Sequence, residues 1–169
     1  MKINKSLGLV RLAALLLLPL VNQAAMSSTA AEDSANKEKV AITQQLQTYE
    51  RALNTADLDA VMRLYAKDAV FMPQHNLPAV GREAVKGAYI QVFKAIRLDI
   101  QFTIDEIILV SKDWAVARTR SNGKVKMIAS EQPPAPEANQ ELFLLHRESD
   151  GKWRFARYIF STTNPPKQQ

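Results

Sequence analysis

The chain has 169 residues, and none of them is cysteine. This absence excludes disulfide bonds, thiolate nucleophiles and zinc sites with sulfur ligands. Only two histidines occur, His75 and His146, and they lie too far apart in the sequence to form a recognisable metal-binding motif. We therefore expect no metal and no other cofactor, and a fold that depends on its hydrophobic core for stability.

The sequence also lacks an apolar run long enough to cross a bilayer comfortably, which takes about 20 residues. Its start instead combines basic residues, the short apolar run 12–21 and a stretch of small residues, an order typical of a secretory signal peptide. We predict that residues 1–30 are a signal peptide and leader, with cleavage after Ala24, Ala25 or Ala30. The protein would then be exported to the periplasm or, alternatively, secreted. An uncleaved N-terminal anchor helix is the other interpretation, and in both cases we expect membrane contact through this segment alone.

No two Lys or Arg residues are adjacent anywhere in this chain. Residues 1–30 carry three of the 22 basic residues and none of the 17 acidic ones, so the remainder has a net charge of +2. A surface that follows a nucleic-acid backbone needs clustered Lys and Arg. We therefore expect no nucleic-acid partner.

Hydrophobic periodicity predicts a long amphipathic helix after a flexible leader at residues 26–34. Ile42, Leu46, Tyr49 and Leu53 recur with the 3.6-residue period of one helix face. This face would pack against the core, and the opposite polar face would meet solvent.

Two shorter helices and one strand are predicted next. Asp57 can cap the second helix because its carboxylate can accept from free N–H groups. Residues 69–72 are typical of a short strand, which ends at Pro73. The third helix is expected from Gly81 to about Ala95.

The rest of the chain predicts β-strands. Alternating apolar and polar residues at 100–105 are typical of a half-buried strand. Further strands are expected at residues 114–119, 125–128, 140–147 and 153–162. The order helix, helix, strand, helix and then strands predicts an α+β fold, with an antiparallel sheet and helices on one face. One domain would span residues 31–166, followed by a tail at residues 167–169.

Two interpretations remain for Asn122-Gly123. Asparagine-glycine is a strong signal for a two-residue hairpin turn. A glycine within a strand can instead mark a bulge or bend. Weak alternation in the short flanking arms favours the bulge or bend.

Residues 41–166 resemble the nuclear transport factor 2-like superfamily. The resemblance rests on ALNTADLDAVMRLYAKDAVFMP and GREAVKGAYIQVF and, for the SnoaL-like subgroup, on ELFLLHRESDGKWRFARYIFSTTNP. It implies a cone-like curved antiparallel sheet with three N-terminal helices on its concave face, a pocket between them, and a homodimer. The superfamily includes ketosteroid isomerases, polyketide cyclases and dehydratases, so the resemblance alone names no reaction.

Tyr49 occupies the place where ketosteroid isomerases carry a tyrosine that stabilises an oxyanion. A core tyrosine with a bonded hydroxyl is the simpler interpretation. The isomerase base would fall at Pro73, flanked by Met72 and Gln74, and none of these can take a proton. The second donor of those enzymes would fall near Phe143, which argues against a steroid isomerase.

Histidine is the alternative base. His75 is expected in the loop after the first strand, near the pocket mouth, and an imidazole titrates near neutral pH. His146 is expected within a strand, on the face that carries Leu142 and Leu144. Either could act with Tyr49, although structural or solvated roles are commoner for such histidines.

A common pocket is expected to gather residues from several elements. On the last strand, alternation places Ala156, Tyr158 and Phe160 on one face and Phe155 on the other, and resemblance assigns the first set to the pocket. The predicted ligand-binding residues are Tyr49, Met72, Phe93, Thr119, Phe143, Tyr158 and Phe160.

Three functions fit these observations. The leading hypothesis is an exported SnoaL-like domain that forms a homodimer and binds a small apolar or amphipathic molecule. The second is a cofactor-independent cyclase, isomerase or dehydratase with Tyr49, His75 and His146 as candidate catalytic residues. The third is a structural association module, which predicts a filled core and a large apolar surface patch.

Overall fold

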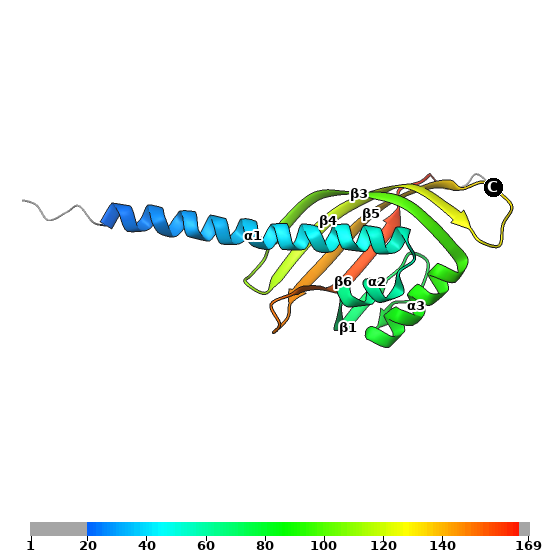
Figure 1. The fold of residues 1–169 in the computed structure, drawn as a ribbon, viewed down its shortest axis with the longest axis horizontal. Coiled ribbons are helices and arrows are strands. Elements are labelled where there is room, and N and C mark those ends of the chain that lie inside the picture. The colour runs from blue at the N-terminus through cyan, green and yellow to red at the C-terminus, as the bar shows by residue number, and fades with distance from the viewer. Residues whose placement is uncertain (1–19, 166–169) are drawn as a thin grey trace, which may run out of the picture. The chain divides into compact units, whose positions relative to one another are not determined.

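The computed structural model describes residues 20–165. The chain divides into two compact units, Met1–Ser34 and Ala35–Gln169. The elements are α1 (Leu20–Asn54), α2 (Leu58–Leu64), β1 (Tyr65–Met72), β2 (Ala79–Val80), α3 (Arg82–Ala95), β3 (Ile96–Leu109), β4 (Trp114–Met127), β5 (Ala135–Arg147) and β6 (Trp153–Thr162). Figure 1 shows their arrangement.

Helix α1 begins earlier than the sequence pattern predicts. Residues 26–34, expected to be a flexible leader, belong to this helix. They contain no glycine or proline, the two residues that most strongly interrupt a helix. Residues 1–19, which hold most of the predicted signal segment, lie outside the described part of the chain. Within the described part, no helix is both long and apolar enough to span a membrane.

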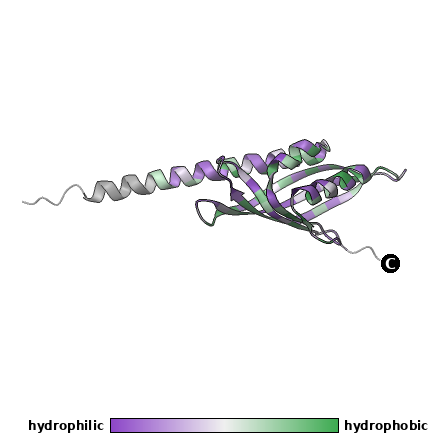
Figure 2. Ribbon diagram, turned by 90° about the horizontal axis from the view of Figure 1, so that it is seen from below, coloured by the Kyte–Doolittle hydropathy of each residue, from purple (hydrophilic) through white to green (hydrophobic). Residues whose placement is uncertain are grey.

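The predicted apolar stripe of α1 is confirmed. Ile42, Leu46, Tyr49 and Leu53 are all buried in the core. The predicted cap is also confirmed, because the Asp57 side chain accepts a 2.9 Å hydrogen bond from the Ala60 amide. The alternation of polar and apolar residues along the helices and strands is visible in Figure 2.

The strands form one sheet in the order β2-β1-β6-β5-β4-β3. The three helices pack against this six-stranded sheet, which confirms the predicted α+β class. One detail differs: β1 pairs with β6 in parallel, whereas the other neighbouring strands are antiparallel. The difference arises because β1 and β6 are the first and last long strands in the chain, so no hairpin fixes their relative direction.

Neither prediction for Asn122-Gly123 is correct as made. Strand β4 continues through both residues, and Gly123 pairs with Ile100 on one side and Glu137 on the other. The register shift between β3 and β4 falls between Ile104 and Glu106 instead. The glycine is required by close packing of β3, since a Cβ atom at this position would lie 2.1 Å from the Asp99 carbonyl oxygen.

A second irregularity changes the face assignment of β6. Leu144 pairs with Arg157 and Leu145 with Phe155, so Ala156 is the extra residue of a bulge. Alternation restarts across the bulge, and Phe155 and Tyr158 both become buried beside Tyr49. The prediction that placed Phe155 on the opposite face is therefore wrong.

Candidate functional site

A cavity of about 120 Å³ lies between the helices and the sheet, and we call it the inner cavity. Apolar and aromatic side chains form most of its wall, and three polar residues of β5 complete it. The lining residues are Tyr49, Leu53, Phe71, Tyr89, Val92, Ile96, Leu98, Ile100, Glu137, Asn139, Glu141, Tyr158 and Phe160.

Three tyrosines from different elements join their hydroxyls beside this cavity. Tyr89 of α3 hydrogen-bonds to Tyr49 of α1 and, at 2.8 Å, to Tyr65 of β1. Burial raises the pKa of each of these phenols well above its usual range, so all three stay protonated at neutral pH. Three hydroxyls supply three protons for two bonds, so one proton is left at an end of this chain, on Tyr49 or on Tyr65 according to the direction in which the bonds run.

Glu141 places a buried carboxyl in the cavity wall. It is 5% exposed. One oxygen accepts from Thr119 Oγ1, and the other accepts from Ser121 Oγ at 2.8 Å. Burial raises the pKa of Glu141 above its ordinary value, although the two hydroxyl bonds act in the opposite direction. The ionised carboxylate is therefore only partly compensated by the protein.

Asn139 adds an acceptor without a partner. Its side chain is 7% exposed, and within the described residues its Oδ1 atom has no hydrogen-bond partner. The Nδ2 atom donates to Glu137 Oε1 at 2.9 Å and to Ser121 Oγ at 3.3 Å. The opposite amide orientation would set Oδ1 against the Glu137 carboxylate, so these contacts determine which atom is left unpaired.

The charges on the cavity wall have one sign. Glu137 and Glu141 line the cavity, and no Lys, Arg or His lines it in the part of the chain that the structure describes. Neither glutamate takes part in an ion pair among residues 20–165. No cluster of potential metal ligands occurs within this range. The site can thus offer hydroxyl donors at one end and anionic or neutral acceptors at the other.

Only some of the predicted ligand-binding residues line the inner cavity. Tyr49, Tyr158 and Phe160 lie on its wall. Phe143 lies behind it and stacks on Tyr158 with ring centroids 4.3 Å apart. Phe93 is likewise off the wall and packs on Tyr89.

Met72 and Thr119 contribute differently from the prediction. Phe71 lines the cavity, and the adjacent Met72 does not, because successive residues of a strand face opposite sides. Thr119 does not line the inner cavity, but it reaches it indirectly through its bond to Glu141.

The two histidines do not join Tyr49. His75 is exposed in the loop after β1 and hydrogen-bonds to Gln74. His146 alternates with the buried Leu145 and packs against Trp114, which is 37% exposed, with ring centroids 4.5 Å apart and the rings tilted by 37°. This contact occurs on the outer face of the sheet, so the structure brings no imidazole to the cavity.

The polar part of the wall was not among the predicted ligand-binding residues. Phe143 was expected in the pocket, and period-2 alternation places Glu141 and Asn139 on the same strand face. That signal was present in the sequence. Tyr89 lies on α3, and its hydroxyl partners come from α1 and β1, so they are not evident from local spacing.

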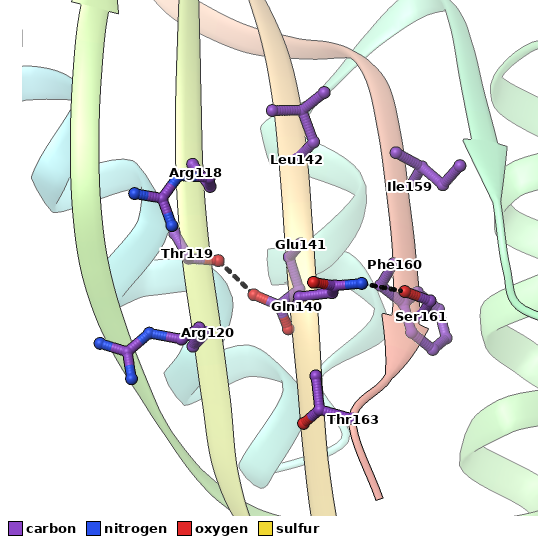
Figure 3. A pocket seen from close by; sticks show the side chains of 10 residues that line it. All are labelled: Arg118, Thr119, Arg120, Gln140, Glu141, Leu142, Ile159, Phe160, Ser161 and Thr163. Carbon is purple, nitrogen blue, oxygen red and sulfur yellow. Dashed lines mark hydrogen bonds between the residues drawn. The ribbon is translucent and has the colours of Figure 1, made fainter.

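A second hollow, of about 330 Å³, lies at the outer face of the sheet. Figure 3 shows it, together with the bond between Thr119 and Glu141 that crosses from β4 to β5. The arginines at its edge are already paired, because Arg118 and Arg120 lie 2.7 and 2.8 Å from Asp105. These ion pairs make a free anion site less favourable there.

Glu141→Gln tests the burial of the carboxyl. Because its pKa is raised, Glu141 stabilises the fold below its unfolded-state pKa, and this stability is lost as the pH rises through the folded-state pKa. The amide keeps the shape and carries no charge. We expect the variant to be more stable than wild type at neutral pH by roughly 1 kcal/mol, with a smaller difference in acid. Thermal unfolding across this pH range measures the difference, and a variant that is less stable at neutral pH would contradict it.

The comparisons with known proteins agree with this architecture. Residues 46–156 match the SnoaL-like domain family. No curated protein matches the chain. A ketosteroid isomerase-like protein from Erwinia carotovora atroseptica has 35% sequence identity, with 77% of this chain and 99% of that chain covered and a TM-score of 0.73.

More distant structures share the fold. LinA has 15% identity, covering 79% of this chain and 90% of its own, with a TM-score of 0.71. A protein from Novosphingobium aromaticivorans, provisionally assigned as a scytalone dehydratase, has 21% identity and a TM-score of 0.68. The match covers 82% of this chain and 99% of that chain. The family match and the 35% identical relative both span most of the domain, and the chain therefore belongs to the SnoaL-like domain family of the nuclear transport factor 2-like superfamily.

Proposed function

We propose that this protein is exported and binds a small, mainly apolar molecule in the inner cavity. The fold is compatible with ligand binding or with isomerase or dehydratase activity. The observation that carries the proposal is the combination of an apolar wall with buried polar groups that lack full compensation, above all Asn139 Oδ1. Ligand sites typically have this composition, with a few polar groups that orient the ligand.

A proton-transfer enzyme is the second candidate. Tyr49 and Glu141 line the same cavity, and burial shifts the pKa of both upward. A carboxyl can move a proton while a phenol stabilises the developing oxyanion. Glu141 takes the role that sequence analysis gave to a histidine.

A homodimer through the outer face of the sheet is also part of the proposal. Leu142 and Ile159 are 46% and 45% exposed there, and both line the outer hollow. Half-exposed apolar side chains beside a hollow suit contact with another copy of the chain. The inner cavity needs no residue from that copy.

Val92→Phe should prevent binding in the inner cavity. Val92 lines this cavity, and the phenyl ring of a phenylalanine at this position would occupy its space. Cavities of about 150 Å³ hold benzene, and cyclopentanol is a soluble molecule of comparable size with one hydroxyl group, so it is a suitable probe. We expect cyclopentanol to shift amide resonances around the cavity in a ¹H–¹⁵N NMR titration, and Val92→Phe to weaken its affinity by about tenfold or more.

Val110→Phe is the matched control. Val110 is 62% exposed, so the same substitution there should leave the titration unchanged. If both variants bind cyclopentanol like wild type, or if neither cyclopentanol nor its amine analogue binds, the binding proposal is wrong. Cyclopentanone in D₂O tests the enzyme candidate, because proton transfer by Glu141 would exchange its α-protons and Glu141→Gln would stop that exchange.

A further inference from the structure

We infer that the inner cavity selects a small apolar amine, bound as its ammonium ion with the N–H donors directed at Asn139 and Glu141. This inference rests on the proposed function and adds the chemical class of the ligand. It follows from the number, sign and burial of the acceptors on the cavity wall.

The acceptors at this end of the cavity outnumber their donors. Asn139 Oδ1 is buried and unpaired, and a buried acceptor without a donor costs about 1–3 kcal/mol. Glu141 has one hydroxyl donor on each oxygen, and each carboxylate oxygen can accept a further bond. Glu137 receives one bond, from the Asn139 amide.

An ammonium group matches this arrangement better than a hydroxyl group. It carries three donors and no acceptor, whereas an alcohol carries one donor. Alternate residues on one strand face are about 7 Å apart at Cα. A nitrogen that makes bonds of about 2.9 Å on two sides can bridge much of that separation between the Asn139 and Glu141 side chains.

The charge of the wall favours a cation for the same reason. A buried carboxylate is costly unless it is paired. Glu141 is buried and Glu137 is half-buried, and neither has an ion-pair partner among the described residues. A bound ammonium ion would supply the missing partner. An anionic ligand would meet two carboxyls and no basic side chain of the described wall.

The rest of the cavity determines the apolar part of the ligand. Phe71, Tyr158 and Phe160 form an aromatic cluster in which each ring lies against the other two, with centroids 5.4, 5.9 and 6.1 Å apart. Aliphatic side chains such as Leu98 and Ile100 complete the wall. With a volume of about 120 Å³, this space suits one small ring or a short branched chain.

Cyclopentylamine and cyclopentanol test the inference because they share a ring and differ in one polar group. Cyclopentylamine is protonated at neutral pH, as other aliphatic amines are. In ¹H–¹⁵N NMR titrations of the purified protein, we expect the amine to bind at least tenfold more tightly than the alcohol. Glu141→Gln should weaken the affinity for the amine about tenfold and change the affinity for the alcohol by no more than about twofold.

Two further variants separate this site from general attraction to acidic surface. Glu131→Gln removes an exposed carboxylate outside the cavity and should change neither affinity. Asn139→Leu removes the unpaired oxygen and keeps a side chain of similar size. It should weaken the affinity for the amine and should not strengthen the affinity for the alcohol by the same factor. It also provides a test if Glu141→Gln does not fold.

The outcomes distinguish this inference from the proposed function. If Val92→Phe weakens the binding of cyclopentanol, and cyclopentylamine binds to wild type no more tightly than cyclopentanol does, the amine inference fails and the cavity proposal stands. If the amine binds more tightly but neither Glu141→Gln nor Asn139→Leu weakens it, the amine inference is also wrong. If neither probe binds, both proposals fail.

Discussion

Phe143→Ala is expected to destabilise the fold by about 3–5 kcal/mol, the usual cost of removing a buried phenylalanine from a packed core. Phe143 is fully buried. Its ring centroid lies 4.3 Å from that of Tyr158 and 4.8 Å from that of Phe155. The substitution would leave a void behind the cavity wall, so we also expect weaker ligand binding.

Chemical denaturation of wild type and variant measures this loss. Leu142→Ala is the matched control, because Leu142 is the adjacent residue on the same strand and points to the outer face, 46% exposed. We expect it to cost less than about 1 kcal/mol in the monomer. Equal costs for the two substitutions would contradict the face assignment, unless the cost at Leu142 depends on protein concentration, as burial in a homodimer would require.

Gly123→Ala is expected to destabilise the fold by about 2–3 kcal/mol. The added Cβ would lie 2.1 Å from the Asp99 carbonyl oxygen and 2.7 Å from Ile100 Cα. Both atoms belong to the backbone of β3, so the strand itself must move, and overpacking of this kind costs about 1–3 kcal/mol. Asn54 bonds to the Ile100 backbone at 2.8 and 2.9 Å, so the movement would also disturb the contact of β3 with α1.

Gly87→Ala provides the opposite expectation in the same protein. Gly87 lies in α3, and no atom comes within 4 Å of a Cβ added there. Alanine is the better helix former, so this substitution should stabilise the fold by about 0.5–1 kcal/mol. Unfolding free energies of both variants check the pair. A Gly123→Ala protein as stable as wild type would show that β3 does not approach β4 as closely as described.

The wall of the candidate site could be predicted only in part. Tyr49 was identified because it lies on an apolar helix stripe and at a position shared with ketosteroid isomerases. Glu141 lies on the same face of β5 as Phe143, so alternation alone could have indicated it. Its burial and its bonds to Thr119 and Ser121 depend on the pairing of β4 with β5, which no local pattern specifies.

Local residue patterns were sufficient to predict those features that depend on a single helix or strand. The buried stripe of α1, the Asp57 cap and the α+β class follow from residue spacing and side-chain hydrogen bonding within a few residues. The SnoaL-like family could also be recognised from the sequence alone. These features depend on periodicity, which is a property of the chain itself.

Contacts between distant residues decided the rest. The bulge at Ala156 reverses the face of Phe155, and β1 runs parallel to β6 although the two strands are far apart in the sequence. Packing of α1 and α3 with β1 brings the hydroxyls of Tyr49, Tyr65 and Tyr89 together. The sequence by itself thus determined the family and the type and order of most elements, whereas the tertiary structure decided which polar groups meet in the cavity, because strand register and bulges depend on packing between elements.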